Sequence, residues 1–389
     1  MNRIMDLERK TISVLGSSGS VGKQALDVAR FHHIPVYGLT GSTSVKLLEE
    51  QIREFSPKKC AMNDESAASD LKIRVADTGC KILAGPEGVC EVASAEQNVS
   101  VVNSITGIAG LLPSLSAIRA GKELALANKE TIVTAGKLVM EESRRLGTPI
   151  LPVDSEHSAI FQSIGSNERS EIRRILLTAS GGPFFGKSIE ELRSITPESA
   201  LAHPTWNMGP KITVDSATLM NKGFEVIEAV HLFGISPDKI EVVVHRESII
   251  HSLVEYNDRA VLAQLSVPDM RLCVQYALTY PHRTESMLAP LDLAGIGMLT
   301  FFRPDLETFK LLRLAYDVAN YPDTTLGATL NGANEAAVAL FLQKKISFTD
   351  ISDYVEHACI NAEKLSLTVE NVFAADASAR RAVFEMYGR

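Results

Sequence analysis

The sequence lacks paired cysteines and long apolar runs. Its five cysteines, at positions 60, 80, 90, 273 and 359, form no C-x-x-C pair, and their odd number argues against a disulfide framework or a zinc cluster. No stretch approaches the roughly 18 uninterrupted apolar residues that suggest a transmembrane helix. The first ten residues alternate charged and apolar side chains and lack the apolar core of a signal peptide. These absences predict a reducing, cytoplasmic setting and no membrane partner.

The sequence also lacks an excess of positive charge. It has 39 Lys and Arg against 47 Asp and Glu, which gives a formal net charge of −8. Nucleic acids and anionic membranes are bound by basic surfaces, so we expect no nucleic-acid partner. Any anionic substrate must therefore be held by a local site. The length of 389 residues exceeds one ordinary core, so two or three domains are expected.

What the sequence does have, over residues 1–149, is an alternation of strands with helices. The patterns predict strands at 11–15, 35–39, 99–103 and 123–127, and helices at 23–30 and 47–55. Such alternation is typical of a parallel, doubly wound sheet. The predicted fold class is therefore α/β, beginning with a doubly wound, Rossmann-like domain.

The remainder of the chain divides by composition. Residues 150–280 mix strands with helices and are predicted to form a central α/β catalytic domain. Residues 281–306 combine several prolines and glycines with little periodicity, which is typical of a linker. Residues 307–389 are helix-like and alanine-rich, and predict a C-terminal helical bundle.

A glycine-rich loop between the first strand and the first helix predicts a dinucleotide site. Its glycines show G-x-x-G-x-x-G spacing, which departs from the usual G-x-G-x-x-G. Backbone N–H groups of such a loop can approach a pyrophosphate, and the helix N-terminus adds partial positive charge. A tight turn without a ligand is the alternative interpretation. The candidate residues are Gly16, Ser17, Ser18, Gly19, Ser20, Val21 and Gly22.

The end of the second predicted strand bears on the choice between NAD and NADP. It continues into Gly41, Ser42, Thr43 and Ser44, and no carboxylate stands there to repel a 2′-phosphate. Hydroxyl and backbone donors are present instead. The turn has no arginine, but its composition favours NADP.

Two carboxylates, Asp154 and Glu156, follow an apolar, strand-like run, and a third, Glu225, lies in a second dense segment. If the strand continues through residue 156, positions i and i+2 fall on one face. A hard divalent cation such as Mg²⁺ or Mn²⁺ prefers oxygen ligands of this kind. An exposed acidic pair is the alternative interpretation.

The second dense segment is rich in groups that can donate to an anion. Asn221, Lys222, Glu225 and Glu228 stand at helical spacings, and Ser216 precedes them. Hydroxyl and amide donors with one point charge suit a phosphate. An exposed Lys–Glu pair on a helix is the alternative interpretation.

Two further segments have site-like composition. The turn Ser180-Gly181-Gly182-Pro183 follows a predicted strand and suits either an anion nest or a plain turn. Residues 203–210 contain two prolines and the only tryptophan, Trp206. They suit a closing flap that excludes water, or a loop pinned by a buried aromatic ring.

With these residues in view, the chain closely resembles the 1-deoxy-D-xylulose 5-phosphate reductoisomerase family of the non-mevalonate isoprenoid pathway. The resemblance covers essentially the whole chain. The motifs that carry it are Leu126-Ala127-Asn128-Lys129-Glu130, the Asp154 segment, Ser180-Gly181-Gly182-Pro183-Phe184, the run from His203 to Glu228, Ser248-Ile249-Ile250-His251-Ser252 and residues 264–271.

The resemblance implies an activity, its cofactors and an assembly. The activity is the NADPH- and divalent-metal-dependent isomerisation and reduction of 1-deoxy-D-xylulose 5-phosphate, a phosphorylated sugar, to 2-C-methyl-D-erythritol 4-phosphate. The metal is implied to be Mg²⁺ or Mn²⁺, and the assembly a homodimer.

The resemblance also implies the roles of individual residues. The implied catalytic residues are Lys129, Glu156, Glu228 and His251. Substrate contacts are implied for Lys129, Ser155, Glu156, Ser180, His203, Trp206, Met208, Ser216, Asn221, Lys222 and Glu225. Cofactor contacts are implied for the glycine loop, Gly41, Ser42, Thr43, Ser44, Asn128, Glu130, Gly209 and Met270, the last of which is by position most simply a core residue. The implied metal ligands are Asp154, Glu156 and Glu225.

Two departures from the family pattern bear on the site. Thr43 and Ser44 occupy a turn in which the family often has lysine and asparagine. The stretch His245-Arg246-Glu247-Ser248 stands where the family commonly reads His-Pro-Gln-Ser.

Two other functions share parts of this pattern. One is a different NADP-dependent, metal-assisted oxidoreductase of a sugar phosphate or an amino-acid semialdehyde. The other is a non-catalytic NADP-binding regulator. Product analysis separates the first, because only a reductoisomerase changes carbon connectivity, and substrate-dependent NADPH oxidation separates the second.

Overall fold

The computed structural model describes residues 10–202 and 209–388. The chain divides into two compact units, and each is assembled from three separate stretches. The first unit comprises Met1–Thr131, Glu141–Ser158 and Asp269–Ala289. The second comprises Ile132–Met140, Ala159–Pro268 and Pro290–Arg389. Among the described residues, no helix has both the length and the apolar character that a membrane span needs.

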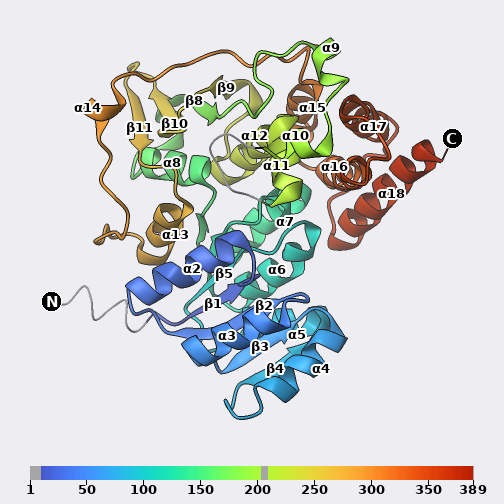
Figure 1. Ribbon diagram of the computed structural model, residues 1–389. Coiled ribbons are helices and arrows are strands. Elements are labelled where there is room, and N and C mark those ends of the chain that lie inside the picture. The colour runs from blue at the N-terminus through green and yellow to red at the C-terminus, as the bar shows by residue number, and fades with distance from the viewer. Residues whose placement is uncertain (1–9, 203–208, 389) are drawn as a thin grey trace. The chain divides into compact units, whose positions relative to one another are not determined.

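The first unit is built on a seven-stranded parallel sheet with the order β4-β3-β2-β1-β5-β6-β7 (Figure 1). The strand order reverses between β1 and β5, as in a doubly wound fold, so the loops that follow these strands form the usual ligand crevice. The strands are β1 Ile12–Leu15, β2 Val36–Gly41, β3 Lys59–Met62, β4 Lys81–Ala84, β5 Ser100–Asn103, β6 Glu123–Leu126 and β7 Ile150–Pro152.

Helices connect these strands and pack against the sheet. They are α2 Ser20–Phe31, α3 Val45–Phe55, α4 Glu65–Arg74, α5 Gly85–Ala93 and α6 Leu111–Arg119, with the short η1 Ile108–Gly110 before α6. The strands β1 and β5 are buried along their whole length, as expected of a parallel sheet covered on both faces. The strands and helices that the sequence predicted here are confirmed, whereas β3, α4, β4, α5 and α6 were not predicted.

The helix α13, Met270–Thr279, also belongs to the first unit. It packs against α2, and it contacts β6 and β7 as well. The side chains that it buries include Cys273, Val274, Ala277 and Leu278. The predicted central domain, residues 150–280, includes this helix, and the predicted domain limits at residues 149, 280 and 306 stay predictions.

The second unit contains a four-stranded sheet with the order β11-β10-β8-β9. Strands β8 and β9 are parallel, and β10 runs antiparallel to both β8 and β11. Strand β11 therefore forms an edge of the sheet. The strands are β8 Ile172–Ala179, β9 Ile240–Val244, β10 Ile250–Tyr256 and β11 Val261–Leu265.

Helices make up most of the remaining second unit. Helix α15 packs on α12, and α16 packs on α17 and α18 at the red end of the chain (Figure 1). The α/β fold with C-terminal helices is thus confirmed. The bounds are α9 Ile189–Leu192, α10 Pro197–Ala200, α11 Pro210–Ala217, α12 Met220–Phe233, α14 Leu293–Ile296, α15 Lys310–Ala319, α16 Leu326–Leu342, α17 Phe348–Ile360 and α18 Val369–Tyr387, with η2 Arg169–Glu171 and η3 Pro237–Lys239.

Two helices run through positions where the chain passes from one unit to the other. They are α7 Lys129–Leu146 and α8 Ser155–Ile164. Within α7, Ala135 has non-helical backbone angles (φ −142°, ψ 26°) and marks a kink. The predicted linker is also more ordered than its composition indicated, since it contains α14 and its residue Phe302 pairs with Val244.

Candidate active site

The glycine loop after β1 can be built only with glycine at two of its positions. Gly16 has φ +74°, and a Cβ there would lie 2.9 Å from the carbonyl oxygen of Ser104. A Cβ on Gly22 would lie 2.3 Å from the carbonyl oxygen of Gly16. The loop is therefore pressed against the start of α2. That helix has no side-chain cap and no acidic residue in its first turn, so its N-terminus fits a pyrophosphate.

The serines of this loop differ in what their hydroxyls do. Ser17 is buried, and its hydroxyl donates to Gln51 Oε1 at 2.7 Å and to the carbonyl oxygen of Thr40 at 3.2 Å. Ser17 therefore braces the loop against β2 and α3, and it can offer a ligand only backbone groups. Ser18 is half-buried and Ser20 is exposed.

The turn after β2 presents exposed hydroxyl groups at Ser42, Thr43 and Ser44. Helix α3 then begins with neither a side-chain cap nor an acidic residue in its first turn. This turn has no arginine, but Lys46, which was not among the predicted residues, is exposed in the first turn of α3. A positive charge two residues beyond Ser44 was the signal that could have identified it.

Asn128 and Glu130 lie where β6 passes into α7. Asn128 caps α7 by accepting from the Thr131 N–H at 2.9 Å, and its amide donates to the carbonyl oxygens of Ile105 (2.6 Å) and Gly107 (2.9 Å). The amide also donates to Glu130 at 3.1 Å. Asn128 thus fixes the loops after β5 and β6 to each other, at the edge of the sheet where a dinucleotide binds in this fold.

A buried charge cluster follows β7. Lys129 Nζ lies 2.8 Å from Asp154 Oδ2, and His157 Nδ1 lies 3.5 Å from Asp154 Oδ1. Burial opposes ionisation of Asp154, but the Lys129 ammonium and His157 outweigh it and hold the pKa of this carboxyl well below its usual range. Glu156 is half-buried and accepts from the Ser155 hydroxyl at 2.5 Å.

The prediction that Asp154 and Glu156 share one face of a strand was wrong. Strand β7 ends at Pro152 and α8 begins at Ser155, and the Ser158 N–H donates to the carbonyl oxygen of Asp154 at 2.8 Å. The two carboxylates therefore stand at the beginning of a helix, where the helix dipole stabilises negative charge. The sequence signal was misleading because the apolar run continues through Val153 up to the first carboxylate, whereas the strand already ends at Pro152.

In the second unit, α12 carries buried charged side chains. Lys222, Glu225 and Glu228 are 4%, 1% and 1% exposed, so the alternative of an exposed Lys–Glu pair was wrong. The Glu225 carboxylate accepts from Asn221 Nδ2 at 2.6 Å and also from Lys222 Nζ. Charges at this depth need such partners. The helical spacing thus gathers one ammonium, one amide and one carboxylate.

The helix before α12 contributes Ser216 and a carboxylate to which the sequence analysis gave no role. Asp215 is 1% exposed, accepts from Asn334 Nδ2 at 2.8 Å and lies 2.9 Å from Lys211 Nζ. It ties α11 to α16 within the second unit. No sequence signal reveals this role, because Asn334 is 119 positions away.

The turn after β8 packs directly against α11. Gly181 and Gly182 have φ of +78° and +66°, and a Cβ on Gly182 would lie 2.6 Å from the carbonyl oxygen of Ser216. The Gly182 N–H donates to the Ser180 hydroxyl at 3.3 Å. Two segments predicted to donate to a phosphate are therefore adjacent.

The structure gives fewer contacts for the remaining predicted site residues. His251, on β10, is buried, and its Nε2 lies 2.8 Å from the Ser266 hydroxyl. Gly209 is exposed immediately before α11, and Met270 is half-buried at the start of α13. His203, Trp206 and Met208 lie outside the described residues.

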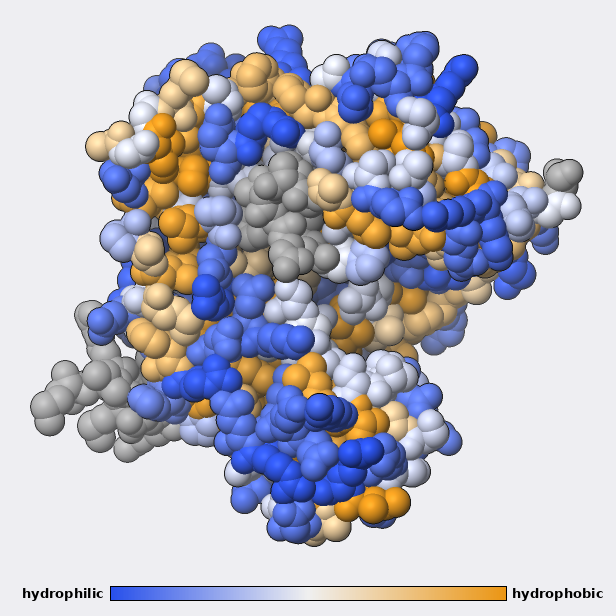
Figure 2. Space-filling model, viewed as in Figure 1, coloured by the Kyte–Doolittle hydropathy of each residue, from blue (hydrophilic) through white to orange (hydrophobic). Residues whose placement is uncertain are grey.

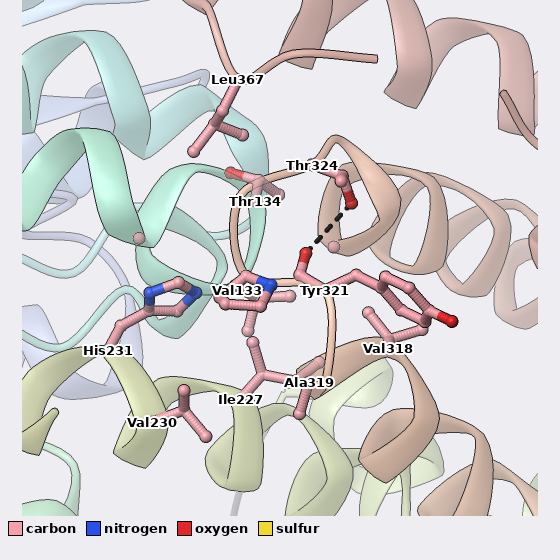
Figure 3. A pocket seen from close by; sticks show the side chains of 13 residues that line it. Val133, Thr134, Ile227, Val230, His231, Val318, Ala319, Tyr321, Thr324 and Leu367 are labelled. Carbon is pink, nitrogen blue, oxygen red and sulfur yellow. Dashed lines mark hydrogen bonds between the residues drawn. The ribbon is translucent and has the colours of Figure 1, made fainter. Parts of the chain in front are cut away.

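The second unit also has a small pocket that is separate from the predicted site residues described above. It is lined by residues of α12, α15, the start of α16 and the kinked part of α7, including His231 and Thr134, and by Tyr321 in the connection between α15 and α16 (Figure 3). A Cβ on Gly136 would lie 2.4 Å from the His231 ring, and burial lowers the pKa of His231 to about 4. None of the predicted site residues in the described ranges lines this pocket.

Comparison with protein families gives matches over most of the chain. A model described as 1-deoxy-D-xylulose 5-phosphate reductoisomerase matches residues 12–136. The C-terminal domain model of the same name matches residues 150–233. A third model, described as the DXP reductoisomerase C-terminal domain, matches residues 265–382.

Relatives and solved structures agree with these matches. The 1-deoxy-D-xylulose 5-phosphate reductoisomerase of Clostridium perfringens (strain 13 / Type A) is 51% identical over 97% of this chain and 100% of the relative. That of Acetivibrio thermocellus is 53% identical over 96% and 98%. The Zymomonas mobilis reductoisomerase in complex with NADPH superposes with a TM-score of 0.91 at 41% identity, covering 97% of this chain and 99% of that chain.

A second solved structure has informative ligands. It is a DOX-P reductoisomerase in complex with NADPH, fosmidomycin and magnesium, with a TM-score of 0.92, 38% identity and coverage of 97% and 98%. The resemblance read from the motifs is confirmed, and the chain belongs to the 1-deoxy-D-xylulose 5-phosphate reductoisomerase family.

Proposed function

We propose that this chain converts 1-deoxy-D-xylulose 5-phosphate to 2-C-methyl-D-erythritol 4-phosphate in non-mevalonate isoprenoid precursor biosynthesis. The reaction is an isomerisation followed by a reduction, and it depends on NADPH and a divalent metal. The observation that carries the proposal is the 51% identity to a reductoisomerase across 97% of the chain. A relative of the same fold binds NADPH and magnesium together.

The first unit supplies the dinucleotide site in this proposal. The loop from Gly16 to Gly22 and the N-terminus of α2 would hold the pyrophosphate. The exposed hydroxyls of Ser42 to Ser44 and the ammonium of Lys46 would hold the 2′-phosphate, in place of the lysine and asparagine common in the family. The remaining proposed contacts are Asn128, Glu130 and Met270 of the first unit, and Gly209, which belongs to the second. When bound, NADPH supplies the hydride that reduces the rearranged aldehyde.

Asp154, Glu156 and Glu225 are the proposed ligands of Mg²⁺ or Mn²⁺. Their oxygen atoms suit a hard cation, and the pKa of Asp154 is already held low, so this carboxylate is an anion at neutral pH. When bound, the metal polarises the ketone of the substrate and favours loss of the neighbouring hydroxyl proton.

The substrate phosphate would be held in the second unit. Ser180, Ser216 and Asn221 offer neutral donors, and the buried Lys222 ammonium offers the point charge. Binding energy from this remote group can orient the reacting carbons. His203, Trp206 and Met208 would close over the substrate and exclude water.

Proton handling is assigned to buried titratable groups. Lys129 Nζ lies 2.8 Å from Asp154 Oδ2, and the Glu228 carboxyl is 1% exposed on α12. These two groups would move protons on and off the substrate oxygens. Ser155 and His251 would contact the hydroxyl groups of the substrate, and Glu156 would serve both metal and substrate.

A homodimer and a cytoplasmic location are also part of the proposal. The edge strand β11 exposes Val261 and Leu262 by 46% and 47%, and an unpaired apolar edge is a template for pairing with another chain. Figure 2 shows apolar side chains gathered on the surface where Figure 1 places β11 and α14. A second copy of this chain is the partner that the resemblance implies.

The predicted domain roles complete the proposal. Residues before 150 would bind the cofactor, and residues 150 to 280 would carry out catalysis.

The deciding experiment follows NADPH oxidation by near-UV absorbance with 1-deoxy-D-xylulose 5-phosphate, with and without Mg²⁺ or Mn²⁺, and with NADH as a control. We expect metal-dependent oxidation that prefers NADPH, and a branched carbon skeleton in the product. Folded, NADPH-binding protein that does not oxidise the cofactor would refute the proposal and favour the regulator. An unbranched product would favour another sugar-phosphate oxidoreductase.

A further inference from the structure

The turn after β9 carries an arginine whose contacts are concentrated on one loop. Arg246 Nη1 donates to the carbonyl oxygens of Ser180 and Gly182, each at 2.7 Å. Its guanidinium carbon lies 5.3 Å from the centre of the Phe185 ring. All three interactions fall on residues 180–185, which follow β8 and include the predicted phosphate donor Ser180.

These two hydrogen bonds set the direction of the peptide groups in the loop. A trans peptide is planar, and its C=O and N–H point in opposite directions. With the Ser180 carbonyl oriented toward Arg246, the N–H of Gly181 is oriented away from it. Gly181 and Gly182 both have positive φ angles, a backbone conformation that glycine adopts readily. Arg246 therefore favours a loop conformation that turns a backbone donor outward.

The opposite side of the loop has no room to relax. A Cβ on Gly182 would lie 2.6 Å from the Ser216 carbonyl oxygen, and one on Gly181 would lie 2.8 Å from Val244 Cγ1. The loop is therefore packed against α11 and β9, with Arg246 holding its carbonyl groups. Loss of the guanidinium would leave two carbonyl oxygens without this donor.

The turn that carries Arg246 is itself fixed. His245 Nε2 accepts from the N–H groups of Ile249 (3.2 Å) and Ile250 (3.1 Å). The Glu247 carboxylate accepts from the Thr300 N–H at 3.2 Å and its hydroxyl at 2.6 Å. Arg246 therefore extends from a turn whose backbone is fixed. Its guanidinium can in turn hold the carbonyl groups of Ser180 and Gly182 in place.

We propose that Arg246 is a positioning residue for recognition of the substrate phosphate, acting by holding the Ser180–Gly182 loop in its donor conformation. The proposal rests on the proposed function, since it takes Ser180 as a phosphate contact. Arg246 itself need not touch the substrate. Both of its bonds leave from one nitrogen, so a lysine ammonium can reproduce them in part.

The test compares Arg246→Met and Arg246→Lys with wild type, using Arg173→Met as the control. Arg173 is a surface residue of β8, 3.4 Å from Glu255, so the control removes the same side chain from the same unit. Steady-state rates give KM for 1-deoxy-D-xylulose 5-phosphate and kcat, and NADPH fluorescence gives the Kd of the cofactor.

For Arg246→Met we expect KM to rise about tenfold, the scale of a lost hydrogen bond to a charged group, with a much smaller change in kcat. The Kd for NADPH should stay at the wild-type value, which a general loss of structure would not allow. Arg246→Lys should recover most of the KM, and Arg173→Met should match wild type.

A wild-type KM in Arg246→Met would overturn the proposal, and so would equal effects in the Met and Lys variants. If the Met variant fails to bind NADPH, Arg246→Gln replaces it, and a wild-type KM there is likewise contrary. An error in the proposed function would give a different result from an error in the role of Arg246. In that case the wild-type protein would show no substrate-dependent NADPH oxidation at all.

Discussion

The Lys129 ammonium and the Asp154 carboxylate form an ion pair, with 2.8 Å between Nζ and Oδ2 and side chains only 7% and 12% exposed. Two opposite charges held this far from water stabilise each other, whereas either alone would be costly to bury. The pair therefore favours the ionised form of Asp154, whose pKa is lowered.

Replacement of Asp154 with Asn should abolish most activity. The variant loses a proposed metal ligand and leaves Lys129 beside a neutral amide, so we expect the rate to fall by about 100-fold or more, as several kcal/mol of metal stabilisation implies. Binding of Mn²⁺, followed by electron paramagnetic resonance, should weaken as well. Asp27→Asn, at a partly exposed position on α2, is the control. Tight Mn²⁺ binding in Asp154→Asn would remove Asp154 from the ligand set.

Replacement of Glu225 with Gln should raise the Mg²⁺ concentration needed for half-maximal rate and lower turnover by about 100-fold. The amide keeps the side-chain shape but loses the charge that Lys222 and Asn221 now contact. Rates measured over a Mg²⁺ series test this, with Glu241→Gln on β9 as the control. Near-wild-type activity at limiting Mg²⁺ would show that Glu225 is not a ligand.

Replacement of Gly22 with Ala should weaken NADPH binding far more than replacement of Gly19. The Cβ at position 22 would lie 2.3 Å from the Gly16 carbonyl oxygen, whereas the one at position 19 would lie 3.2 Å from it. The first contact forces the loop away from α2, and the second needs only a small adjustment. Fluorescence titration with NADPH gives both Kd values. Equal Kd values would mean that the close approach does not shape the site.

Replacement of His231 with Phe should reduce the sensitivity of the protein to acid. The pKa of His231 is lowered to about 4 by burial, so between pH 6.5 and 4 the unfolded chain takes up the proton more readily than the folded one. Wild-type stability therefore falls as pH drops through this window, by up to about 3 kcal/mol from this group. Urea unfolding at pH 7.5 and 4.5 should show a smaller loss in the variant. His282→Phe, at an exposed position, should behave as wild type, and an unchanged pH dependence in His231→Phe would contradict the assignment.

Replacement of Leu262 with Glu should dissociate the proposed dimer. The side chain is 47% exposed on the edge strand β11, and a charge there opposes burial against a second copy. Light scattering after size-exclusion chromatography measures the mass. Ile73→Glu, an exposed apolar position on α4, should leave the mass unchanged. A dimer that persists in Leu262→Glu would place the interface elsewhere.

The parts of the fold that were predictable from sequence are those that local patterns specify. The first β–α unit was recognisable because the glycines lie between an apolar strand and an amphipathic helix. The placement of Asp154 and Glu156 failed because an apolar run does not reveal the residue at which a strand gives way to a helix. The contacts of Asp215 and Arg246 were not predictable, because their partners are remote in sequence and no pattern at either end indicates the other.

The assignment of α13 to the first unit has a consequence for the order in which the chain can fold. Its partner α2 ends at Phe31, whereas α13 begins at Met270. A ribosome must therefore add more than two hundred further residues before the first unit can be completed, although its sheet strands have all emerged by then. Domains are generally expected to fold in order of synthesis. Here the surface of α2 that receives α13 stays uncovered while most of the second unit is being made, so nascent chains truncated before residue 270 should expose a site for chaperone binding.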